Sequence, residues 1–126
     1  EEFILLKRRY TLDNVRYWLL AQQATENCQM DFVTILYFYD ENCNDCPSQG
    51  TVLSYYKAIL DTELLVFPID EGLSSEEPLV EILFSLYDIE VNPSIVINDD
   101  VHEGFISKND LKVLLCEEKE DLSICT

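Results

Sequence analysis

Basic side chains are scarce in this sequence, and the shortage limits what the protein can bind. The chain has 8 Lys and Arg against 25 Asp and Glu, which gives a formal net charge of −17 at pH 7. Nucleic-acid binding needs cations that neutralise phosphates, and only the short cluster at residues 7–9 brings several together. Anionic membrane surfaces are disfavoured for the same reason. We therefore expect no nucleic-acid partner and a soluble, self-repelling acidic surface.

Glycine, proline and long apolar runs are also in short supply. The chain has only 3 Gly and 4 Pro, which favours regular elements joined by short connections. No window reaches the ~18 apolar residues of a transmembrane helix. The apolar stretch at residues 3–6, followed by the basic cluster, is either a short first strand or the stub of a membrane anchor upstream. The sequence leaves the cellular compartment open.

What the chain does have is enough apolar sequence for one folded domain over residues 1–126. Apolar residues make up 48 % of the chain, and this length buries roughly two-thirds of the unfolded chain's surface. Hydrophobic periodicity predicts alternating helices and strands. Helices are expected at 11–26, 50–60, 74–86 and 107–116, and strands at 32–39, 63–70, 94–97 and 101–106. In the third helix, Leu79, Ile82, Leu83 and Leu86 share one face. This order predicts an α/β fold with helices on both faces of a central mixed sheet, closed by an antiparallel hairpin.

The cysteines carry the clearest chemical signal. Cys43 and Cys46, with two residues between them, lie between the strand at 32–39 and the next helix. This spacing forms a tight reversible disulfide, and a helix N-terminus beside Cys43 favours its thiolate. A structural disulfide or half of a zinc site would use the same spacing. Zinc commonly takes two closely spaced Cys/His pairs, and the remaining candidates (Cys28, Cys116, Cys125 and His102) provide no second pair.

The order of elements, the two cysteines and an isolated proline before the strand at 94–97 together resemble the thioredoxin-like family. The resemblance covers about residues 31–116, with 117–126 as a C-terminal tail, and implies a three-layer α/β/α sandwich. It implies that Pro93 is a cis-proline and that Asn92 and Pro93 bind substrate peptides. It also implies that Cys43 attacks a disulfide and that Cys46, more buried, resolves the mixed disulfide. No cofactor is implied.

The sequence departs from the family pattern at positions that affect how strongly the Cys43 thiolate is stabilised. The best-known motif of the family has Gly-Pro between the cysteines, and thioredoxin proper has a buried aspartate six residues before the first cysteine. This chain has Asn-Asp, and Tyr37 stands at the aspartate's position. We expect Tyr37 to be first of all a core residue of the strand; the alternative is that its hydroxyl reaches toward Cys46 and supplies a hydrogen bond there. The carboxylate of Asp45, with those of Asp40 and Glu41, opposes thiolate formation. We therefore expect a reducing or isomerising thiol–disulfide oxidoreductase rather than a strong oxidant, and not a typical thioredoxin.

Its partners would be protein or peptide disulfides and an electron-donating reductase or small thiol. The alternative is a redox-inactive binding module that uses the same fold and groove for recognition. Five cysteines leave at least one thiol unpaired within the chain or paired with another molecule. Cys28 and Cys116 are expected to be buried free cysteines. A bridge from Cys125 to either of them, or a second redox relay, remains possible, and His102 is expected at the surface.

Overall fold

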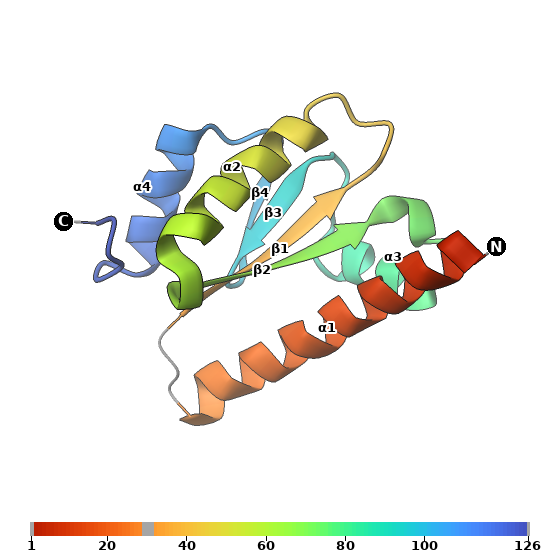
Figure 1. Cartoon of the computed structure of the whole chain (residues 1–126), viewed down its shortest axis with the longest axis horizontal. Coiled ribbons are helices and arrows are strands. Elements are labelled where there is room, and N and C mark those ends of the chain that lie inside the picture. The colour runs from red at the N-terminus through yellow and green to blue at the C-terminus, as the bar shows by residue number, and fades with distance from the viewer. Residues whose placement is uncertain (1, 29–31, 126) are drawn as a thin grey trace.

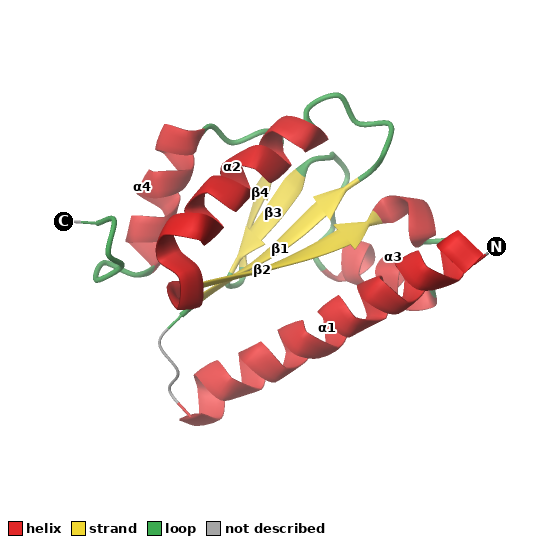
Figure 2. Cartoon of the chain, viewed as in Figure 1, coloured by secondary structure: helices red, strands yellow, loops and turns green. Residues whose placement is uncertain are grey.

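The computed structural model describes residues 2–28 and 32–125, and their strands form one mixed sheet. Three strands form its centre and one edge: β1 (Val33–Tyr39), β2 (Leu64–Asp70) and β3 (Ser94–Ile97). β4 (Asp100–Glu103) completes the order β2-β1-β3-β4. β1 runs parallel to β2 and antiparallel to β3, and β3 forms a hairpin with β4. The expected mixed sheet with a closing hairpin is therefore confirmed (Figure 2).

Helices cover both faces of this sheet (Figure 1). Cores on the two faces are separate: α2 (Cys46–Leu60) and α4 (Lys108–Glu118) pack on one side, and α1 (Glu2–Cys28) and α3 (Pro78–Leu86) on the other. Side chains of β1 alternate between the two cores, since Ile35 and Tyr37 face one and Leu36 and Phe38 the other. Burial on both faces explains why this strand is a continuous apolar run in the sequence.

Of the two alternatives that the sequence left open for residues 3–6, the short first strand is wrong. These residues begin α1, which continues unbroken to Cys28. Ion pairs hold its first turns against the rest of the fold, because Lys7 contacts Asp70 and Arg8 contacts Glu77 at the start of α3. A short apolar run does not distinguish strand from helix, and here the contacts of the following basic residues favour the helix. None of the helices in the described ranges is long and apolar enough to cross a membrane.

Without that strand, β2 is an edge of the sheet, and its outer side is protected. The carbonyl oxygen of Pro68 accepts a hydrogen bond from Asn14 Nδ2 at 3.3 Å, and that of Leu64 from Lys57 Nζ at 2.7 Å. Both carbonyls belong to alternate residues of the strand, so they point to the same side, away from β1. Pro68 also offers no N–H on that side. A proline and charged or polar side chains limit edge-to-edge pairing with another molecule.

Two smaller expectations also differ from the structure. On α3, the buried residues are Val80, Leu83 and Phe84. Leu79, Ile82 and Leu86, expected on one face with Leu83, are exposed. The helix therefore turns a face toward the sheet that is shifted by about one residue from the expected one. The second helix also starts at Cys46 rather than Gly50, which places one of the motif cysteines inside it.

The carboxyl group of Glu118, at the end of α4, lies beside the hairpin turn between β3 and β4. Asn98 Nδ2 donates to Glu118 Oε2 at 3.2 Å. Burial and the neighbouring Asp100 raise the pKa of Glu118 from 4.5 to about 7. The folded state therefore binds this proton more tightly than the unfolded chain does. The resulting stabilisation is complete below about pH 4.5 and is lost as the pH rises toward 7.

We predict that Glu118→Gln removes this loss of stability. Between pH 5 and 8 the free energy of unfolding of the variant should fall less steeply than that of the wild type. At pH 8 the variant should be the more stable protein. Denaturant unfolding at a series of pH values measures this, with Glu117→Gln as a control because Glu117 is an exposed carboxylate on the same helix. Parallel pH profiles for wild type and Glu118→Gln would contradict the prediction.

Candidate redox site

The site lies at one end of the sheet, where the pairing of β1 with its two neighbours brings three connections together. Tyr39 at the end of β1 pairs with Asp70 at the end of β2, and Phe38 pairs with Ser94 at the start of β3. The segment carrying Cys43 follows β1 directly, and Pro93 immediately precedes β3. The predicted nucleophile and the predicted peptide-binding loop therefore share this end of the molecule.

Cys43 and Cys46 form a disulfide, with their Cα atoms 5.4 Å apart. Cys46 is the first residue of α2 and is only 3 % exposed, whereas Cys43 lies before the helix and is half-buried. The turn is held by the backbone, since Cys43 N–H donates to the Asp40 carbonyl at 3.2 Å. One sulfur is thus accessible and the other protected, as a nucleophile and a resolving thiol require.

The start of α2 places its positive dipole end and its carboxylates close to Cys43. Asp45 is the residue that precedes the helix, but its side chain makes no capping hydrogen bond and is exposed. The Asp45 carboxylate therefore makes no hydrogen bond to the backbone N–H groups at the helix N-terminus. Glu41, by contrast, is paired with Lys7 of α1 at 2.6 Å, and this hydrogen bond raises the pKa of Lys7. Of the three acids expected to oppose the Cys43 thiolate, Glu41 is therefore partly neutralised.

Tyr37 of β1 is hydrogen-bonded to the motif. Its hydroxyl donates to the backbone carbonyl of Cys46, and its ring stacks on that of Tyr39 with centroids 5.2 Å apart. The hydroxyl thus reaches toward Cys46, as the sequence suggested, although the acceptor is the backbone rather than the sulfur. Burial raises the pKa of Tyr37 to about 12. The side chain therefore stays neutral near pH 7 and acts by positioning rather than by accepting a proton.

A buried glutamine that the sequence reasoning missed anchors the same helix. Gln49 is 0 % exposed, and its amide donates to the Ile106 carbonyl at 3.2 Å and accepts from Ile106 N–H at 2.7 Å. This pair of bonds ties the first turn of α2 to the segment between β4 and α4. The available signal was a polar residue among the apolar positions of a helix, which identifies no partner by itself.

The Asn92–Pro93 peptide bond is cis. The Asn92 side-chain amide donates to Glu71, which directly follows β2, so this loop is fixed to the neighbouring connection. Pro93 is buried and its carbonyl accepts from Gly104 N–H at 2.8 Å. The loop is therefore held on both sides next to the start of β3, where a docking peptide would meet a defined backbone. Its role in substrate binding stays a prediction.

The other candidate residues are three cysteines and a histidine outside the motif. Cys116 and Cys125 form a second disulfide, so the expectation of a buried free Cys116 was wrong. Cys28 ends α1, and its side chain lies outside the described part of the structure. His102 is half-buried on β4, opposite Ile95. Within residues 2–28 and 32–125, no cluster of three or more His, Cys, Asp or Glu side chains could hold a metal ion.

Comparison with solved structures identifies the fold. The chain is similar to thioredoxin-2, a component of the malaria parasite protein secretion machinery (TM-score 0.59, 21 % identity, covering 68 % of this chain and 82 % of that one). It is also similar to chloroplastic thioredoxin z (TM-score 0.59, 20 % identity, 79 % and 89 %). A third similar structure is a thioredoxin variant from Halobacterium salinarum (TM-score 0.55, 23 % identity, 69 % and 74 %).

No protein-family model and no curated protein matches the sequence. The chain nevertheless has the thioredoxin fold, with helices on both faces of a mixed sheet. The fold and the disulfide between Cys43 and Cys46 together support a redox function in general.

We predict that Tyr37→Phe destabilises the protein by about 1 kcal/mol, because the Cys46 carbonyl loses a buried hydrogen bond. Urea unfolding of the oxidised protein measures the change. Tyr55→Phe is the control, since it removes the hydroxyl of an exposed tyrosine on the same helix as Cys46. Equal stability of the Tyr37→Phe variant and the wild type would show that the hydroxyl does not hold the start of α2.

Proposed function

We propose that this protein is a thiol–disulfide oxidoreductase that acts on protein or peptide disulfides in the reducing or isomerising direction. The observation that carries the proposal is the unequal burial of two bonded sulfurs at a helix N-terminus. Cys43 is half-buried before α2, and Cys46 is buried as its first residue. An external disulfide can reach the first sulfur and not the second.

The reductive reaction proceeds in two exchanges. The Cys43 thiolate attacks one sulfur of the substrate disulfide, which forms a mixed disulfide and releases the other substrate sulfur as a thiolate that takes up a proton. Cys46 then loses its proton and attacks the Cys43 sulfur. This step releases the second substrate thiol and closes the Cys43–Cys46 disulfide. Two electrons pass from the protein to the substrate, and a reductase or a small thiol returns them.

The residues around the pair divide into activating and opposing groups. The positive end of the α2 dipole favours the Cys43 thiolate by about 0.3–1 kcal/mol. The carboxylate of Asp45, which is exposed and makes no capping hydrogen bond, opposes it. The motif has no Lys or His between the cysteines to add stabilisation. A weakly stabilised thiolate favours the oxidised, disulfide-bonded form of the enzyme, and such a protein is a better reductant than oxidant.

Substrate docking would use the loop that ends in Asn92 and Pro93. Extended peptides bind to exposed backbone by pairing like an added strand. The Asn92 side chain is held by Glu71, and the Pro93 carbonyl by Gly104 N–H, so the loop is rigid before a substrate arrives. Rigid binding elements lower the entropy cost of association.

Insulin reduction by dithiothreitol tests the proposal. The wild type should accelerate the reaction, and Cys43→Ser should return the rate to the uncatalysed background because Cys46, the sulfur of the motif that remains, is buried. Cys46→Ser should still attack but accumulate the mixed disulfide with insulin, which mass spectrometry detects.

Cys28→Ser serves as the matched control, since Cys28 ends α1 and belongs to neither Cys43–Cys46 nor Cys116–Cys125. Its rate should equal that of the wild type. Equal rates for the wild type and Cys43→Ser would refute the enzyme and favour a redox-inactive binding module with the same fold.

A further inference from the structure

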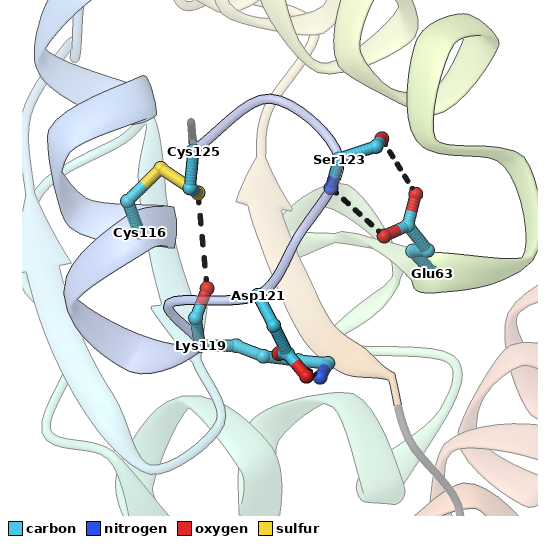
Figure 3. Close-up of polar contacts among 6 residues, drawn as sticks. All are labelled: Glu63, Cys116, Lys119, Asp121, Ser123 and Cys125. Carbon is cyan, nitrogen blue, oxygen red and sulfur yellow. Dashed lines mark hydrogen bonds and ion pairs between the residues drawn. A yellow bond between two sulfur atoms is a disulfide. The ribbon is translucent and has the colours of Figure 1, made fainter.

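The second disulfide fastens the C-terminal segment, residues 119–125, to the end of α4 (Figure 3). Cys116 lies in the last turns of α4, and Cys125 follows it by 9 residues. Between the two, the chain folds back over the helix end, and Cys125 Sγ contacts the Lys119 carbonyl at 3.8 Å. The disulfide therefore closes a short loop of the chain, from Cys116 to Cys125, that contains this segment.

This segment completes one of the two cores. Leu122 is 1 % exposed and belongs to the core cluster beneath α2 and α4, and Ile124 packs against that cluster. Ser123 adds a polar anchor, because its N–H and hydroxyl donate to the two carboxylate oxygens of Glu63 at 3.0 and 2.8 Å (Figure 3). If the segment leaves, it exposes the core and frees Glu63.

The second disulfide lies at the opposite end of the sheet from the first. Glu63 immediately precedes β2, whose first residue pairs with the first residue of β1, whereas Cys43 follows the last residue of β1. Strands of this length span roughly 20 Å at about 3.3 Å per residue. The two disulfides of one molecule therefore cannot exchange directly, and electrons for the second must come from another molecule.

An outside thiol can reach this bond. Both cysteines are half-buried rather than enclosed, and both line a surface groove of about 440 Å³. Ile124 and Val113 supply apolar lining, while Lys112, Glu117 and Glu120 supply charges. Exchange requires access of a thiolate to one sulfur, and the groove provides that access.

We propose that Cys116–Cys125 is a second thiol–disulfide exchange site, whose reduction by an external dithiol releases the C-terminal segment from the core. The dithiol's thiolate attacks one sulfur of the pair and forms a mixed disulfide, and the other cysteine leaves as a thiolate that takes a proton. The second thiol of the dithiol loses its proton, closes its own disulfide and releases the remaining cysteine. Two electrons pass from the dithiol to the pair. The inference does not depend on redox activity at Cys43.

The test uses the full chain carrying Cys43→Ser and Cys46→Ser, so that Cys116–Cys125 is the disulfide observed. The protein is equilibrated with dithiothreitol without denaturant, and alkylation with mass spectrometry reports each cysteine. Hydrogen exchange then compares residues 119–125 with β1 in the oxidised and reduced protein. We expect Cys116 and Cys125 to be alkylated together in folded protein. Exchange in the segment should accelerate by about tenfold or more, since the loop constraint is lost, while β1 stays protected.

Two further variants separate the bond from the other contacts. Cys125→Ser should reproduce the fast exchange of the reduced segment without any reductant. Ser123→Ala, which loses the hydroxyl bond to Glu63 but keeps the disulfide, should remain closer to the oxidised wild type. The proposal is overturned if the pair resists reduction until the whole protein unfolds. It is equally overturned if the pair is reduced and the segment's exchange does not change. The dithiothreitol result decides the question even if Cys125→Ser fails to fold.

Discussion

The pairing of β1 with both of its neighbours is the constraint on which the rest of the structure depends. β1 is buried on its two faces and runs parallel to β2 and antiparallel to β3. Because of these directions, the segment after β1, the segment after β2 and the segment before β3 meet at one end of the sheet. The strand directions bring Cys43, Glu71 and the Asn92–Pro93 loop to this end, and hydrogen bonds hold the loop in place there.

The same arrangement gives the molecule two chemically different ends. One end carries Cys43 beside a helix N-terminus, with Tyr37 and Gln49 fixing the first turn of α2. The other carries a disulfide that closes the core beneath Leu122. The first turns of α1 also lie at the first end, since Lys7 bridges Glu41 beside the motif and Asp70 at the end of β2. The N-terminal segment forms a helix rather than a strand that would pair with β2. The free edge of β2 is therefore protected by hydrogen bonds from side chains.

Much of this fold could be predicted from the sequence because its strands are buried and several of its helices begin at recognisable capping residues or prolines. The runs at 32–39 and 63–70 are apolar apart from Thr34, Glu63 and Asp70, which is typical of strands covered on both faces. The start of α1 could not be predicted, since residues 3–6 fit either element and ion pairs of Lys7 and Arg8 with distant residues decide between them. The motif residues Cys43 and Cys46 were recognisable by spacing. Gln49 and the partner of Cys125 were not, because both depend on contacts between segments that are adjacent only in the folded chain.

The reduction potential of the Cys43–Cys46 pair tests the central claim most directly. Equilibration with dithiothreitol redox buffers, followed by alkylation of Cys43, measures it. The dipole of α2 stabilises the Cys43 thiolate and the carboxylate of Asp45, which makes no capping hydrogen bond, opposes it. Together they predict a value near that of reducing thioredoxins, about −270 mV. Asp45→Asn should shift the value toward more oxidising potentials, whereas Glu120→Gln, with the same change of charge near the other disulfide, should not. A wild-type potential near −120 mV, as in strong oxidants, would contradict the account.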